Sequence, residues 1–270
     1  MEYINLKDPK HAYFFGFVQT DGTLTASSRN RGKLQIEVKE RDAHILRSFQ
    51  KLFPLFYSSI TKRTRDTNFK KNYVSFVLSI FDMEFRNKIN KLGVSYGKKS
   101  LIVAPPKGNF CEKDYIRGLI DGDGSVGITG KGVPFVSITV KSEALKNYLC
   151  DIIIKITGER KRLVRNKRDN IYNIMINREK AQKFIRYLYY PDCFTLKRKL
   201  KGAQTALKWK RPKELKKISS KFWEPIEDTY ILNYSIEKAC TKLERTERSI
   251  KIRLWRLKNK NAHYLRACLT

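Results

Sequence analysis

In two segments of the chain, apolar residues would cover nearly every face of a helix. After each segment the pattern changes to strict alternation of apolar and polar residues. The helices predicted at residues 11–20 and 114–122 are apolar almost all round, which indicates that both are buried. Apolar and polar residues alternate in residues 34–39 and 136–141, as in strands with one buried face. An amphipathic helix, a basic hairpin and a closing helix follow in each case. Each half is therefore predicted to fold as helix, two strands, helix, two strands, helix.

The two halves are copies of one another at an offset of 102 residues. The stretches that align without gaps are FFGFVQTDG at residues 14–22 and IRGLIDGDG at residues 116–124. The same offset relates LQIEVK to VSITVK in the strands that follow. The chain is therefore predicted to hold a duplicated unit.

The predicted motif helices carry a glycine at the same interior place, Gly16 and Gly118. A glycine inside a helix costs ~1 kcal/mol relative to alanine, and the usual compensation is close approach of another backbone. We expect the partner to be the equivalent helix of the other half. If the helices pack as a pseudo-twofold pair, their C-terminal ends bring Asp21 and Asp123 together.

Charge indicates the kind of partner. The chain has 57 Lys and Arg against 26 Asp and Glu, a formal net charge of +31. Residues 160–168 hold six basic residues and no acid, and residues 62–71 hold five against one Asp. A solvated surface is the simpler explanation of one such run, but two runs at equivalent places in a duplicated sheet favour contact with nucleic acid. No apolar run approaches the ~20 residues of a membrane-spanning helix, and the first residues lack a signal-peptide core, so no membrane partner is expected.

Cysteine and histidine patterns restrict the chemistry. The five cysteines are widely spaced and never form a C-x-x-C pair, which argues against a disulfide framework and against zinc, and which fits a reducing compartment. The three histidines show no metal-binding spacing. Any catalysis must therefore rest on carboxylates, and two carboxylates at one helix-end junction favour a divalent metal. The alternative is that each Asp-Gly pair only ends a helix in a turn.

The C-terminal part has a different pattern. Ten basic residues and one acid lie between residues 197 and 217, which predicts a helix end followed by a charged linker. Three short helices follow, with Ser235 and Thr246 as predicted caps of the last two. The apolar residues expected to face inward are Ile226, Tyr230, Ile231, Ala239, Leu243, Ile250, Leu254 and Leu257. This stretch resembles the Myb-like helix-turn-helix class, whose final helix enters the major groove of DNA. A protein-interaction module of similar shape is the alternative.

The paired motifs resemble those of LAGLIDADG homing endonucleases of the single-chain, two-repeat type. The resemblance covers about residues 10–200 and implies that DNA is held on the saddle formed by two αββαββα repeats. It also implies that Asp21 and Asp123 bind Mg²⁺ or another divalent metal, together with the backbone carbonyls of Thr20 and Gly122. Gln19 departs from the acid at the sixth place of the motif, which is not an essential ligand in that family. Lys39 and Lys141 occupy the same place in both repeats and are the candidate lysines near the cleavage centre, with phosphate positioning as the alternative.

The candidates for DNA contact lie on polar strand faces, in the basic hairpins and on the last helix. They are Thr25, Ser27, Arg29, Gln35, Glu37, Arg63, Arg65, Tyr73 and Ser75 in the first half, Thr129, Lys131, Ser137, Thr139, Arg165, Lys167 and Asn173 in the second half, and Arg248, Lys251, Arg253 and Arg256 in the C-terminal module.

The predicted fold class is α+β, with two pseudo-twofold-related repeats plus a small all-α helix-turn-helix domain. The predicted divisions are residues 1–104, 105–202, 203–221 and 222–270, for first repeat, second repeat, basic linker and helix-turn-helix domain.

The predicted function is metal-dependent double-strand cleavage of DNA at a long asymmetric site by a monomer. A LAGLIDADG-derived transcriptional regulator and an intron RNA maturase, both without cleavage activity, are the alternatives. A bacterial or phage-encoded cytoplasmic protein is expected, with an organellar protein as the alternative.

Overall fold

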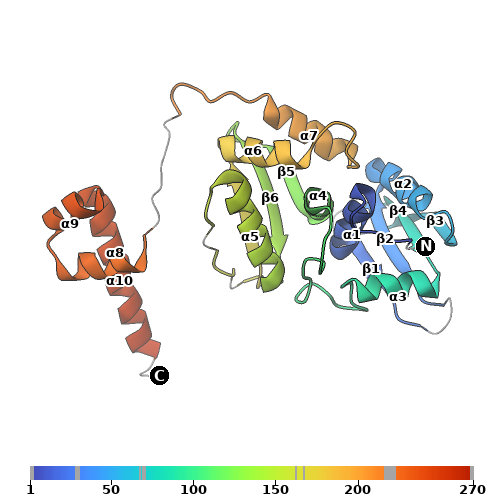
Figure 1. Cartoon of the computed structure of the whole chain (residues 1–270), viewed down its shortest axis with the longest axis horizontal. Helices are drawn as coiled ribbons and strands as arrows, with labels where there is room; N and C mark the ends of the chain where they lie inside the picture. Colours follow the sequence, from blue (N-terminus) through green and yellow to red (C-terminus); the bar gives the residue numbers. More distant parts are fainter. Residues whose placement is uncertain are drawn as a thin grey trace. The chain divides into compact units, whose positions relative to one another are not determined.

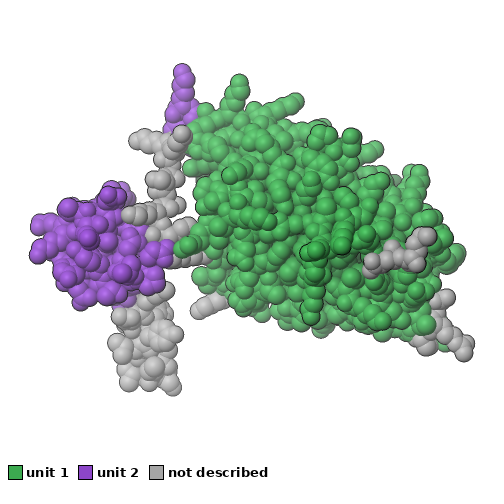
Figure 2. Space-filling model, in the orientation of Figure 1, with its two compact units in different colours: residues 1–211 green, residues 212–270 purple. Residues whose placement is uncertain are grey.

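The structure is a computed structural model that describes residues 3–27, 31–66, 68, 71–161, 163–166, 168–215 and 223–267. They form two compact units, which we call the first unit (residues 1–211) and the second unit (residues 212–270) (Figure 2). The first unit contains both copies of the motif, so the two predicted repeats share one compact body. In the part of the chain that is described, no helix combines the length and the apolar character needed to cross a membrane.

The first half follows the predicted order of elements. These are α1 (Pro9–Asp21), β1 (Gly22–Leu24), β2 (Leu34–Lys39), a short 3-10 helix (Glu40–Asp42), α2 (His44–Leu52), β3 (Ser58–Arg65), β4 (Tyr73–Ile80) and α3 (Met83–Lys91). The strands form an antiparallel sheet in the order β1-β2-β4-β3. Asp8 starts α1, because its carboxylate accepts hydrogen bonds from the backbone N–H groups of Lys10 and His11.

The second half differs from the prediction in its basic hairpin. Its elements are α4 (Glu112–Asp123), β5 (Gly124–Ile128), β6 (Pro134–Val140), α5 (Glu143–Thr157), β7 (Tyr172–Asn177), α6 (Arg178–Leu188) and α7 (Lys197–Leu207). The sheet has the order β5-β6-β7. Where the sequence predicted a further strand, the described residues form only an isolated bridge between Asn166 and Ile171. Leu163 and Val164 are adjacent, so they cannot share one face of a strand, and Val164 is 91% exposed.

The strands that follow the two motifs pair in the same register. Gly22 lies opposite Ile36, and Gly124 lies opposite Ile138, so the offset of 102 residues holds for both strands of each pair. Helix α2 packs on β3 and β4, and helices α5 and α6 pack on β6. The buried apolar residues of both halves belong to one hydrophobic cluster. In Figure 1, α1 and α4 lie side by side between the two sheets.

Helix α7 crosses the predicted boundary between residues 202 and 203. Ala203 and Ala206 are buried in the first unit. The side chain of Gln182, on α6, donates a hydrogen bond to the carbonyl of Ala206 at 3.0 Å. The residues at the start of the predicted linker are therefore the last turns of a packed helix.

The second unit holds α8 (Pro225–Asn233), α9 (Ile236–Leu243) and α10 (Glu247–Ala267). Its core is Ile231, Ala239 and Ile250, and the predicted caps of the last two helices are confirmed. The prediction for Ile226 is wrong, because this side chain is 78% exposed. Glu227 takes the inward position instead and pairs with Arg245 at 2.8 Å.

Candidate functional site

Helices α1 and α4 touch through their backbones at the two motif glycines. A Cβ atom on Gly16 would overlap the carbonyl oxygen of Tyr115, and a Cβ on Gly118 would overlap the carbonyl oxygen of Tyr13. The two contacts are reciprocal, since each glycine meets the equivalent tyrosine of the other helix. The predicted close approach of the motif helices is confirmed, and it explains why each helix carries a glycine at a cost to its own stability.

The same two tyrosines also bond across the helix pair. The hydroxyl of Tyr13 donates to Oδ2 of Asp121 at 2.7 Å, and the hydroxyl of Tyr115 donates to Oε1 of Gln19 at 2.5 Å. All four side chains are buried. These crossed hydrogen bonds fix the axial position of one helix against the other.

This packing brings the predicted acids to one place. Asp21 is the last residue of α1, and Asp123 is the last residue of α4. A Cβ on Gly122 would lie 3.5 Å from Oδ2 of Asp21, so the two helix ends adjoin. Burial raises the pKa of Asp21 to about 6, with the charge of Asp123 as the second cause. The pKa of Asp123 is also raised by partial burial.

Two lysines that sequence reasoning missed lie at the same junction. Lys99 donates to the carbonyl oxygens of Val18, at 2.6 Å, and Gly22. Lys199 does the same on α4, with Ile120 at 3.1 Å and with Gly124. Burial lowers the pKa of both amines to about 8, and both lysines act electrostatically on Asp21 and Asp123.

The sequence did contain a weak signal for these lysines. Each is the last residue of a short basic run, residues 98–99 or 197–199, and each lysine follows its motif by almost the same number of residues. The basic runs lie outside the aligned motifs and strands, so the repeated motifs do not include these lysines.

A pocket of about 350 Å³ opens beside the junction. Thr20, Lys99, Asp123, Thr139 and Lys141 are among its lining residues. The predicted Lys141 therefore borders the site. Its counterpart Lys39 instead lies 6.0 Å from the ring centroid of Tyr73, at the end of β2.

The junction fits a divalent cation with oxygen ligands. In the described residues, no group of three or more His, Cys, Asp or Glu side chains could hold a metal, so a site here would combine two carboxylates with backbone oxygens. Thr20 and Gly122 lie in the last turns of α1 and α4, where helix carbonyls have no partner further along the helix. The two carboxylates repel each other when both are ionised, and a divalent cation bound between them would offset that repulsion.

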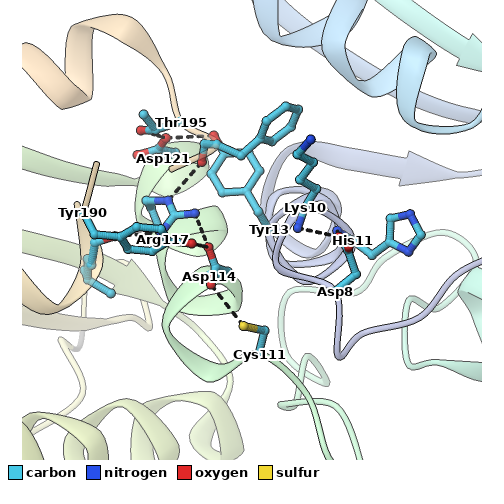
Figure 3. Close-up of polar contacts among 12 residues, drawn as sticks. Asp8, Lys10, His11, Tyr13, Cys111, Asp114, Arg117, Asp121, Tyr190 and Thr195 are labelled. Atoms are coloured by element: carbon cyan, nitrogen blue, oxygen red, sulfur yellow. Dashed lines mark hydrogen bonds and ion pairs between the residues drawn. The ribbon is translucent and has the colours of Figure 1, made fainter. Parts of the chain in front are cut away.

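Asp121, at the sixth place of the second motif, is unavailable to a metal. Its carboxylate accepts four hydrogen bonds of 2.7 Å, from the hydroxyls of Tyr13, Tyr189 and Thr195 and from the backbone N–H of Leu196. Figure 3 shows this carboxylate beside a second buried polar group, in which Arg117 pairs with Asp114. Arg117 also donates to the carbonyls of Leu188 and Phe194, so the network ties α4 to the segment that precedes α7.

On the first sheet, several predicted DNA-contact residues bond to each other. Glu37 pairs with Arg65 at 2.9 Å and with Arg63 at 3.5 Å, and it accepts a hydrogen bond from Ser75 at 2.6 Å. The prediction for Ser75 is wrong, because this residue is fully buried beneath the cluster. Arg63 and Arg65 remain exposed and keep a basic edge on β3.

On the second sheet, Thr139 donates to Asn173 at 3.0 Å, and both are exposed on neighbouring strands. Arg165 lies over the ring of Tyr172 and bonds to the carbonyl of Asn170. The predicted Arg29 and Lys167 lie outside the described residues. The other predicted DNA-contact residues of the first unit are exposed or half-buried: Thr25, Ser27, Gln35, Tyr73, Thr129, Lys131 and Ser137.

In the second unit, one of four predicted contact residues has a structural role. Arg253 forms a two-bond ion pair with Asp228, with distances of 2.5 and 2.7 Å, and this pair holds α10 to α8. Arg253 therefore does not face freely outward as predicted. Arg248 and Arg256 are exposed, and Lys251 is exposed but pairs with Glu247 one helical turn away.

Comparison with known proteins gives a consistent relationship. Residues 111–189 match the profile of a LAGLIDADG-like domain, a region that includes the second motif and its sheet. No curated protein matches the sequence. The fold is similar to that of the homing endonuclease I-WcaI bound to its DNA recognition sequence, with a TM-score of 0.52 at 15% identity, over 74% of this chain and 90% of that one.

Two further solved structures are similar at lower scores. They are the I-LtrWI LAGLIDADG homing endonuclease bound to target DNA (TM-score 0.46, 14% identity, 74% of this chain and 88% of that chain) and the N-terminal LAGLIDADG domain of DUF199/WhiA (TM-score 0.43, 13% identity, 69% and 84%). The chain thus contains a LAGLIDADG-like domain within a fold that is found in homing endonucleases.

Proposed function

We propose that this protein is a site-specific endonuclease that cuts both strands of DNA with the help of a divalent metal. The observation that carries the proposal is the junction of α1 and α4, where two carboxylates end two packed helices beside the buried Lys199 and the half-buried Lys99. A turn alone requires neither the shared site nor the lysines. The similarity to I-WcaI supports the fold on which this chemistry would occur.

The residues of the junction have separable roles. Asp21 and Asp123, with the carbonyls of Thr20 and Gly122, would hold the metal. A divalent metal bound there lowers the pKa of an attacking water and stabilises the leaving oxygen of the scissile phosphate. Lys99 and Lys199 would add positive charge where the phosphate gains negative charge. Lys141 at the pocket rim would position the backbone of the DNA.

The two halves would act as pseudo-twofold repeats in a single chain, one for each strand. The common register and the reciprocal glycine contacts support this arrangement. Their open sheet faces differ, with the Glu37 cluster on one and the Thr139–Asn173 pair on the other. We therefore propose a long, asymmetric double-stranded target bound by a monomer, and sedimentation of the complex should give one protein per DNA.

The second unit would add DNA contacts outside those of the first unit. Its three helices fit a helix-turn-helix arrangement, and Arg248 and Arg256 are exposed on the last helix. The ion pair of Arg253 with Asp228 holds that helix in place. We propose that α10 enters a major groove beside the site of cleavage.

The test uses the full-length protein, Mg²⁺ and linear DNA that spans the insertion locus of its gene without the gene. We expect one double-strand break, which Asp21→Asn and Asp123→Asn should abolish while DNA affinity stays within about tenfold. Asp151→Asn, at an exposed acid on α5, is the matched control and should cut normally.

Other outcomes assign the protein differently. Specific binding of this DNA without any cut would favour a regulator. Preferential binding of the intron transcript over the DNA would favour an RNA maturase. A single aspartate variant that cuts both strands at the normal rate would refute the assignment of the acids.

A further inference from the structure

The sixth motif positions, Gln19 and Asp121, are occupied by different residues that share one arrangement. Both are buried polar side chains, 2% and 0% exposed, at the equivalent place of α1 and α4. Each accepts a hydrogen bond from a tyrosine of the opposite helix. These bonds use only part of the hydrogen-bonding capacity of each side chain.

Other hydrogen bonds of each side chain go to the chain segment that carries Lys99 or Lys199, the two lysines of the junction. Nε2 of Gln19 donates to the carbonyl of Ala104 at 2.9 Å, a few residues after Lys99. The Asp121 carboxylate accepts from the backbone N–H of Leu196 at 2.7 Å, one helical turn before Lys199. Neither bond belongs to the helix pair itself.

In each half, the motif helix and the lysine-bearing segment are therefore joined by hydrogen bonds in both directions. The motif helix bonds through its sixth residue to the lysine-bearing segment, and the lysine bonds back to the last carbonyls of the same helix. We propose that Gln19 and Asp121 are positioning residues that hold Lys99 and Lys199, respectively, against the acids of the junction. The inference rests on the proposed function only for its effect on cleavage.

The two sets of hydrogen bonds differ in strength, because the sixth residue differs. Gln19 makes one neutral hydrogen bond to its segment, whereas Asp121 binds its segment as a carboxylate through Thr195 as well as Leu196. Hydrogen bonds to an ionised group are roughly twice as strong as neutral ones. As a whole residue, Lys199 is also the less exposed of the two lysines, with 3% exposure, whereas Lys99 is half-buried. Lys99 is therefore held more loosely than Lys199.

The first experiment measures the lysines directly, without DNA or metal. Full-length protein is treated with an amine-acetylating reagent, and the rate at each lysine is read by mass spectrometry. Gln19→Met, which cannot donate to Ala104, should speed acetylation of Lys99 about tenfold, the effect of one buried hydrogen bond, and leave Lys199 unchanged. Asp121→Asn should do the reverse.

Matched controls separate the tether from the helix pair. Tyr115→Phe removes only the bond across the helices to Gln19, and Tyr13→Phe removes only that to Asp121. Both should leave the lysine rates within about twofold. Thr195→Val is a milder change than Asp121→Asn and should also raise the acetylation rate of Lys199. This variant serves as the test if Asp121→Asn fails to fold.

The second experiment measures nicking of each strand of bound DNA in single turnover. Gln19→Met and Asp121→Asn should each slow the nicking of one strand about tenfold more than that of the other, on opposite strands and with unchanged DNA affinity. Acetylation rates of Lys99 and Lys199 that stay at their wild-type values in every variant would overturn the tether. The expected acetylation pattern in a protein that never cuts DNA would refute the proposed function and leave the tether intact.

Discussion

Replacing Asp21 by Asn should stabilise the free protein while it abolishes cleavage. The pKa of this carboxyl is raised from 3.8 to about 6 because the group is buried and faces the charge of Asp123. The native state therefore holds the proton more tightly than the unfolded state does. In metal-free protein, ionised Asp21 opposes folding.

The pH dependence follows from the direction of this shift. The contribution of Asp21 to the free energy of unfolding should be most favourable where this group is protonated in both states, below about pH 4, and should become less favourable as pH rises from about 4 to about 6. Above pH 6 the whole penalty is present. A shift of about two pKa units corresponds to about 3 kcal/mol, and partial exposure reduces this to about 1–2 kcal/mol. Asp21→Asn should recover that amount at pH 8 and nothing at pH 3.5.

Urea unfolding in EDTA at the two pH values measures the difference. Asp121→Asn is the contrasting variant, because its carboxylate accepts four hydrogen bonds and its loss should cost about 2 kcal/mol or more at pH 8. Added Mg²⁺ should stabilise the wild type and have little effect on Asp21→Asn. If Asp21→Asn lowers the free energy of unfolding at pH 8 as Asp121→Asn does, Asp21 is a structural acid and the reasoning fails.

Four further outcomes are expected. Gly118→Ala should destabilise the first unit by about 3 kcal/mol in thermal unfolding, because the new methyl overlaps the carbonyl of Tyr13. Arg117→Met should cost about 3–5 kcal/mol in urea, since it leaves the buried carboxylate of Asp114 without its cationic partner. Residues 1–211 alone should still cut DNA at high protein concentration, with a footprint shortened on one side; an unchanged footprint would assign the second unit to a protein partner. Arg248→Ala should lower the slope of log affinity against log salt by ~0.9, as expected for one phosphate contact, without changing the nicking rate of bound DNA.

The sequence was sufficient to predict the elements whose pattern repeats. The aligned motifs predicted two buried helices in contact at their glycines, and the alternation after them predicted β2 and β6 with the correct buried faces. Both predictions succeed because a buried helix or strand face requires apolar residues at a regular spacing, and this spacing is visible within a single segment of the sequence. The inward residues of α10 were predictable for the same reason.

The errors arose where a side chain meets a partner far away in the chain. Lys99 and Lys199 look like ordinary basic residues until the fold brings them to the ends of α1 and α4. Arg253 has the outward spacing of a contact residue, yet Asp228 on another helix binds it. Ile226 loses the inward place to Glu227 because Arg245 offers a buried ion pair. No local pattern records these pairings.

The crossed tyrosine bonds and reciprocal glycines of α1 and α4 have a consequence for the products of cleavage. Sliding one helix along the other by a turn, about 5.4 Å, would break both tyrosine bonds and bring side chains into both glycine contacts at once. The spacing of Asp21 and Asp123 is thus rigid, and in a nuclease it would set the distance between the two cut phosphates. The stagger between the two cuts is then a property of the protein, the same for every target sequence that it accepts.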